Sequence, residues 1–98
     1  MDTGLVIKRQ YVRRHLMMMV VEQLFNDYRQ QGYEVKTQYP VAANMRADLF
    51  AVKGEEKIVI ELVDGDLPSE AKERLEQTVS AEGFSLRIID ITKVTMER

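Results

Sequence analysis

The chain has 98 residues, of which 45% are hydrophobic and 31% are charged, and its formal net charge is -2. This length predicts a single domain over residues 1–98 that can bury roughly two-thirds of its unfolded surface. The absence of cysteine excludes disulfides, thiolate zinc sites and cysteine nucleophiles, and a lone histidine, His15, excludes a histidine-rich metal site.

No stretch of the sequence approaches the roughly 18 consecutive apolar residues of a membrane helix. The start, MDTGLVIKRQ, lacks the ordered basic, apolar and small-residue blocks of a signal peptide. We therefore expect a cytoplasmic protein with no membrane partner.

The charges are distributed unevenly along the chain. Residues 55–82 carry nine acids against three bases, whereas the first 20 residues are basic. The basic residues of this first segment are Lys8, Arg9, Arg13 and Arg14, against Asp2. Such a face is either a solvated helix surface or a contact for nucleic-acid phosphates, whose neutralisation supplies most non-specific affinity.

The hydrophobic period predicts a helix from about Gln10 to Gln31, which Gly32 ends. Its inward stripe consists of Met17, Val20, Val21, Leu24 and Tyr28. The run LMMMVV, residues 16–21, is apolar on nearly all sides. This surplus is explained either by further cover within the core or by a homodimer contact through the first helix.

Three strand patterns follow the helix. YEVKTQYP, residues 33–40, alternates large and polar side chains and ends at a proline, and VAANMR, residues 41–46, is expected to be a connection. RADLFAVKG, residues 46–54, and KIVIELV, residues 57–63, flank a turn at Gly54 and predict a hairpin.

A second helix and a fourth strand complete the pattern. The loop DGDLPSE, residues 64–70, leads into a helix that starts at Pro68 or Ser69 and ends at Gly83, and FSLRIIDIT, residues 84–92, is the last strand. A helix between the third and fourth strands is a crossover that sets them parallel, whereas the first three strands meander antiparallel. The predicted fold class is α/β, with a mixed four-stranded sheet flanked by a helix on each face.

Two carboxylates lie inside otherwise apolar strands. Asp48 follows Ala47 in the second strand, and Glu61 lies near the end of the third. A carboxylate in a strand interior is costly unless it is paired, hydrogen-bonded or bound to a metal. Strict alternation groups Asp48 with Arg46 and Phe50, and Glu61 with Lys57 and Val59. If those faces coincide, the two carboxylates lie within reach of one ion.

This element order, with Asp48 and Glu61 in RADLFAVKGEEKIVIELV, resembles the PD-(D/E)xK, or restriction-endonuclease-like, nuclease superfamily. The stretch EQLFNDYRQQGYEVKTQYPVAANMRADLFAV is similar in particular to the archaeal Holliday-junction resolvases and their small relatives. The resemblance covers about Glu22 to Ile91 and implies the restriction-endonuclease-like αβββαβ fold.

The resemblance also implies a metal site and a DNA substrate. Asp48 and Glu61 would be ligands of Mg²⁺, beside the backbone carbonyl of Leu62, and Glu22 matches an accessory acid on the first helix. Hard oxygen ligands suit that ion. No Gly-rich phosphate cradle, nucleophile elbow or zinc spacing is present, so we expect no nucleotide cofactor.

The sequence departs from the family at the catalytic lysine, because Val63 occupies its position. A valine neither orients a nucleophile nor stabilises developing charge. Lys36 on the first strand is the preferred replacement, with Lys72 and Arg74 on the second helix as further candidates; Lys57 lies on the order of 13 Å away along its own strand.

Three functions stay open at this point. The first is a DNA-associated binding or assembly module whose active site is degenerate or weakly active. The second is an active Mg²⁺-dependent DNA endonuclease or resolvase with a relocated lysine. The third is an acidic protein-interaction domain with no role at DNA.

Overall fold

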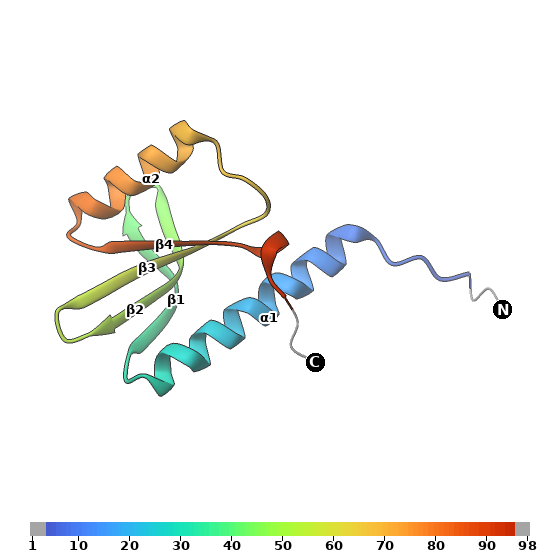
Figure 1. Ribbon diagram of the computed structural model, residues 1–98, viewed down its shortest axis with the longest axis horizontal. Coiled ribbons are helices and arrows are strands. Elements are labelled where there is room, and N and C mark those ends of the chain that lie inside the picture. The colour runs from blue at the N-terminus through green and yellow to red at the C-terminus, as the bar shows by residue number, and fades with distance from the viewer. Residues whose placement is uncertain (1–3, 96–98) are drawn as a thin grey trace.

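The computed structural model describes residues 4–95, which fold into a four-stranded sheet with a helix on each side (Figure 1). The elements in chain order are α1 (Arg9–Gln30), β1 (Glu34–Ala42), β2 (Met45–Lys53), β3 (Glu56–Val63), α2 (Ser69–Ala81), β4 (Ser85–Asp90) and a short 3₁₀ helix, η1 (Ile91–Lys93). The predicted order of helix, three strands, helix and strand is confirmed. No helix of this part of the chain has the length and apolar content that crossing a bilayer requires.

The sheet has the strand order β1-β2-β3-β4. The first three strands pair antiparallel in sequence, and β4 pairs parallel with β3 after the α2 crossover. Gly54, with a φ of 59°, takes the left-handed position in the β2–β3 turn, which a glycine adopts without steric cost. The α/β class and the mixed sheet expected from the sequence are therefore observed.

Each face of the sheet has its own hydrophobic core. On one face, Val20, Leu24 and Tyr28 of α1 pack on Leu49 and Ile60. On the other face, Val79 of α2 joins a cluster with Val41, Ala47, Phe50 and Val59. The inward stripe predicted for α1 is confirmed, with Met17 and Val21 partly buried at its edge.

Two predicted boundaries were wrong. The segment expected to connect β1 and β2 is mostly strand, and only Ala43 and Asn44 form the turn. Val41 extends β1 because its side chain is buried in the α2-side core, which outweighs the low strand propensity of its neighbours. At the other end, β4 stops at Asp90 because its carboxylate accepts hydrogen bonds from the backbone N–H and the hydroxyl of Thr92 and thereby begins η1.

The amino-terminal half of α1 projects beyond the sheet, and the extended segment before it continues in the same direction (Figure 1). The radius of gyration is 15.8 Å. A compact chain of this length has a value of about 13 Å. The projecting segment therefore presents side chains that the fold does not cover.

Candidate functional site

Asp48 and Glu61 lie where strands β2 and β3 part. The ladder between these strands runs from Lys53 opposite Glu56 to Leu49 opposite Ile60, and Asp48 and Glu61 are the next residues. The Oδ2 atom of Asp48 accepts a hydrogen bond of 2.8 Å from the N–H of Leu62. In return, the carboxylate of Glu61 accepts the backbone N–H of Asp48. Each carboxylate thus replaces a backbone bond that the parting strands no longer make.

The environment of Glu61 disfavours its charged form. Burial, and secondly the negative charge of Asp48, raise the pKa of Glu61 from 4.5 to about 7, although the hydrogen bond from the Asp48 N–H opposes this. The Oε1 atom of Glu61 is buried and has no hydrogen-bond partner among the described residues. Such an oxygen takes an ordered water or a cation as its partner, and protonation of the carboxyl removes its charge.

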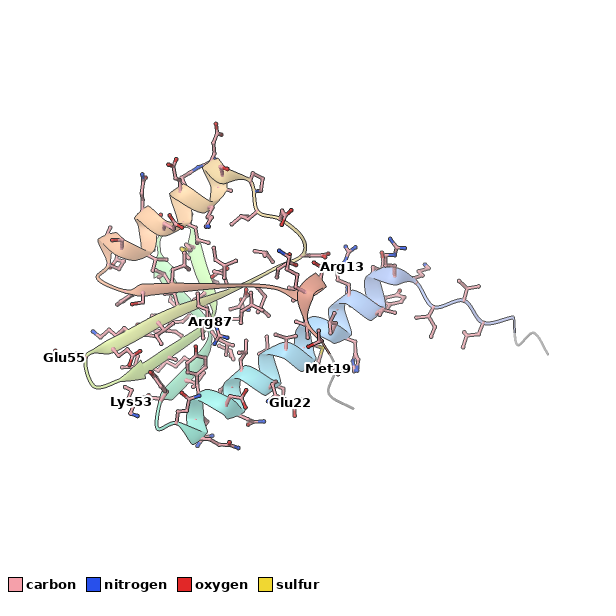
Figure 2. The ribbon with its side chains drawn as sticks, viewed as in Figure 1. Arg13, Met19, Glu22, Lys53, Glu55 and Arg87 are labelled. Atoms are coloured by element: carbon pink, nitrogen blue, oxygen red, sulfur yellow. The ribbon has the colours of Figure 1, made fainter. Side chains whose placement is uncertain are left out.

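A hollow of about 590 Å³ lies over Asp48, between α1 and the ends of the strands. Asp48 and Leu62 line it from the sheet, and α1 contributes Arg14, His15 and Glu22. The structure therefore brings the predicted accessory acid Glu22 to the same hollow as Asp48. Figure 2 shows Glu22 on the side of α1 that faces away from the sheet, so it lies at the outer rim of the hollow.

Gln38 lines the same hollow and has a strained backbone. Its φ of 50° lies in the left-handed region, which is unusual for a side chain of this size and often marks a functional position. The β1–β2 ladder pairs Thr37 with Leu49 and Tyr39 with Ala47, but omits the pair between Gln38 and Asp48. The sequence held no signal for this irregularity, because glutamine is not typical of that conformation.

The irregularity corrects the predicted face of Asp48. Ala47 and Phe50 belong to the same α2-side core although they are three positions apart, an odd spacing, so strict alternation fails between them. Asp48 consequently lines the α1-side hollow and does not share a face with Phe50. Arg46 does not pair with Asp48 either, and donates instead to the carbonyl of Gln38 at 3.3 Å.

Lys36, the preferred substitute for the family lysine, lies on the other side of the sheet. Its partner across the ladder is Phe50, and its Nζ atom lies 5.7 Å from the centre of the Tyr39 ring. Lys36 lines a separate hollow with Lys57 and Phe84. The hollow that Asp48 lines contains no lysine among the described residues.

The four predicted nucleic-acid-binding residues lie on the exposed, projecting part of α1 and at its start. Arg13 forms an ion pair with Asp64, just after β3, and points toward that loop (Figure 2). The guanidinium of Arg14 lies 5.9 Å from the centre of the Tyr11 ring. Lys8 and Arg9 form no ion pair with another described residue and are exposed.

Asp90 orders the loop beside this region. It accepts hydrogen bonds from the N–H of Gly65 and from both the N–H and the hydroxyl of Thr92, and the hydroxyl bond does most to lower the pKa of Asp90. Asp64, in the same loop, forms the ion pair with Arg13, whereas Asp90 fixes the loop through its hydrogen bond with Gly65. An aspartate two residues before a threonine at a strand end is a weak signal for such a cap.

The donor set of Asp48 and Glu61 fits one hard divalent cation. Two carboxylates with several waters can hold Mg²⁺, and the unpartnered Oε1 of Glu61 supplies an available ligand atom. Within residues 4–95, however, no three acidic or histidine side chains converge as a metal-binding group, so Glu22 does not complete a triad with them.

Comparison of the chain with protein families, curated proteins and solved structures finds no match. The assignment of a family and an activity therefore depends on the geometry of the hollow and on the fold.

Proposed function

We propose that this chain is a DNA-associated domain of the restriction-endonuclease-like class whose active site is degenerate, so that it binds DNA and cleaves it weakly or not at all. The αβββαβ order and the mixed sheet are compatible with that class. The position of the two carboxylates, where the central antiparallel strands part, supports the same assignment.

The observation that carries the proposal is the meeting of two kinds of charge at one hollow. Asp48 lies on its floor, and Arg14 and His15 of the basic helix lie on its wall. Between residues 4 and 21 the chain has four lysine and arginine residues and no acid. A phosphodiester backbone is attracted to such a helix and is also bridged to carboxylates by a divalent cation.

Asp48 and Glu61 would hold the cation, which we propose to be Mg²⁺. When bound, such an ion neutralises charge on phosphate oxygens and lowers the pKa of a bound water. In this proposal the strands hold the two carboxylates where β2 and β3 part, and the basic helix attracts the DNA backbone. Asp48 lines the hollow directly, whereas Glu61 lies behind it and is not part of its lining. Binding of the ion at Glu61 requires the ionised form, which the pKa of about 7 makes available near neutrality.

The missing lysine argues against efficient cleavage. Val63 occupies its position in the sequence, and Lys36 lies in a different hollow, with its ammonium above Tyr39. The hypothesis of an active endonuclease therefore loses Lys36, the lysine that the sequence favoured as a replacement. Arg14 and His15 are the basic side chains among the described residues that line the hollow, and neither belongs to the strand that bears Glu61.

The proposal is tested by measuring the affinity for linear and branched duplex DNA across a salt series, with and without Mg²⁺. Affinity should fall as salt rises, and a Lys8→Glu, Arg9→Glu double variant should lower the slope of log affinity against log salt by about 2. Lys72→Glu, an exposed change on α2, is the matched control and should leave the slope nearly unchanged.

The Mg²⁺ dependence tests the carboxylate pair separately. Mg²⁺ should strengthen DNA binding by the wild type and not by Glu61→Gln. An affinity that does not respond to salt, or no binding to either DNA, contradicts the proposal and favours the acidic protein-interaction domain. Efficient cleavage that Asp48→Asn abolishes contradicts the degenerate site and favours the active endonuclease.

A further inference from the structure

An outward stripe of α1 repeats at the spacing of a helix–helix seam. Tyr11, His15, Met18, Glu22 and Phe25 follow one another at alternating steps of four and three residues. This spacing keeps side chains on one side of a helix and is the repeat by which two helices pair. The side chains of Tyr11 and Met18 are 51% and 63% exposed, and His15 and Glu22 are exposed as well. Phe25, at the end of the stripe, is partly buried against the α1-side core.

We propose that this stripe is the contact between two copies of the chain, with the two α1 helices antiparallel and their two-fold axis near Met18. Met18 then meets the partner's Met18, and Tyr11 lies opposite the partner's Phe25. The inference does not rest on the proposed DNA function, because it is drawn from the spacing, exposure and charge of α1 alone. His15, Met18, Glu22 and Phe25 also line the hollow over Asp48, so a second copy seated on the stripe would compete with DNA at that hollow.

Charge selects the antiparallel arrangement. With the axis near Met18, the basic Arg14 and His15 lie beside the partner's Glu22, and by symmetry Glu22 lies beside the same residues of the partner. A parallel pair would bring Arg14 next to the partner's Arg14 and Glu22 next to the partner's Glu22. Opposite charges therefore meet in one arrangement and like charges in the other, which sets the register of paired helices.

The shape of the molecule agrees with this partner. Apolar side chains continue before the helix, where Val6 and Ile7 are 85% and 67% exposed. In the antiparallel pair this extended segment runs past the partner's Phe25, beside the hollow that the same ring lines. Lys8 and Arg9 of one copy then lie at one end of the pair and those of the second copy at the other end, where they remain accessible.

The alternative occupant of a basic and apolar helix is an anionic membrane surface. A membrane explains exposed methionine, valine and arginine side chains, but it does not explain an acid within the stripe. Glu22 is exposed and lies four residues after Met18, so it would face the anionic headgroups. The second copy accommodates Glu22 by pairing it with Arg14 and His15, and is therefore the occupant we infer.

The pairing from Tyr11 to Phe25 covers about 21 Å of helix, since each residue advances the axis by about 1.5 Å. A contact of this length lies at the small end of specific interfaces, so we expect a reversible dimer. Sedimentation equilibrium over a concentration series, without DNA or Mg²⁺, measures it directly. We expect a monomer at the lowest concentrations and a dimer at the highest.

Met18→Glu places two carboxylates together at the two-fold axis and should weaken dimerisation by about 100-fold or more. Val12→Glu is the matched control, because Val12 is 55% exposed but lies outside the stripe, and it should change the dissociation constant by less than about threefold. Because both side chains are exposed, circular dichroism should show the same helix content for both variants and the wild type.

Charge reversal supplies a second test that a folding defect does not imitate. Arg14→Glu and Glu22→Arg should each weaken the dimer by about tenfold, and the double variant should recover most of the loss. A monomer at every concentration, equal effects of Met18→Glu and Val12→Glu, or a double variant without recovery would overturn the inference. A monomer that binds phosphatidylserine vesicles through Met18 would also overturn it, in favour of a membrane surface.

Discussion

The two halves of α1 belong to one uninterrupted helix, but one half is buried against the sheet and the other is exposed to solvent. In the carboxyl-terminal half, Val20, Leu24 and Tyr28 are buried against the sheet. In the amino-terminal half, Tyr11 and Val12 are more than half exposed, and basic side chains surround them. The difference shows that apolar content does not by itself decide burial, because the helix is longer than the part of the sheet that it crosses (Figure 1).

The run of apolar residues from Leu16 to Val21 contains the boundary between these halves. Leu16 and Met17 are half-buried and Val20 is buried, whereas Met18 is 63% exposed. Cover within the core therefore explains only part of this run, and the homodimer contact stays a proposal for the rest. One set packs in the core, and the other remains available to a partner.

The largest expected effect separates the two halves by stability. Leu24→Ala removes a buried side chain from the α1-side core and should lower the free energy of unfolding by about 2–5 kcal/mol. Val12→Ala in the projecting half should change it by less than about 0.5 kcal/mol. Urea unfolding at low protein concentration checks both. Similar losses for the two variants would mean that the projecting half is also packed.

A smaller effect is expected at the end of the β2–β3 ladder, where Glu61 lies next to Asp48. The pKa of Glu61 rises from 4.5 to about 7 on folding, so the folded chain binds a proton more tightly than the unfolded chain. The stability that Glu61 contributes is complete below about pH 4.5, decreases as the pH rises through 7, and is then lost. The cause is the partial burial of a negative charge.

Glu61→Gln keeps an acceptor for the N–H of Asp48 and removes this titration. Because Glu61 is partly exposed to solvent, the variant should exceed the wild type by only ~1–2 kcal/mol at about pH 8. Near the acid end of the range the two proteins should be equal, apart from the amide exchange itself. The difference between their urea midpoints over a pH series measures this, and a difference independent of pH contradicts the assigned cause.

The smallest expected effect concerns the ion pair between Arg13 and Asp64, which we call the tether because it joins the projecting half of α1 to the loop after β3. Arg13→Ala removes the ion pair with Asp64, and both side chains are partly exposed. Such pairs contribute about 0–1 kcal/mol, and the loss should shrink as salt rises. Urea unfolding at low and high salt checks it. A loss as large as that of Leu24→Ala would show that the tether stabilises the fold more than the core contact does.

The regular part of the fold was predictable because its signals are local and repeated. The period of α1, the Gly54 turn, the start of α2 after Pro68 and the parallel β3–β4 pair all followed from patterns of hydrophobicity, glycine and proline. The β1–β2 turn was misplaced because the burial of Val41 depends on α2, which lies far along the chain.

The candidate site was predicted in its residues more than in its geometry. Asp48 and Glu61 were identified as carboxylates within apolar strands, and the structure places them next to each other at the point where the strands part. The face of Asp48 was misjudged because the break in alternation at this residue accompanies the left-handed backbone of Gln38 on the neighbouring strand. Lys36 lies opposite Phe50, so the same break separates it from Asp48.

The most direct test of the proposed site is a count of the cations bound by the carboxylate pair. Mn²⁺, which takes the same oxygen ligands as Mg²⁺, loses its free-ion paramagnetic resonance signal when it binds to the protein. At slightly alkaline pH, where Glu61 is ionised, the wild type should bind one Mn²⁺ per chain, and a double variant with Asp48→Asn and Glu61→Gln should bind none. Equal binding by both proteins, or no binding by the wild type, would contradict the assignment of this pair as the cation site.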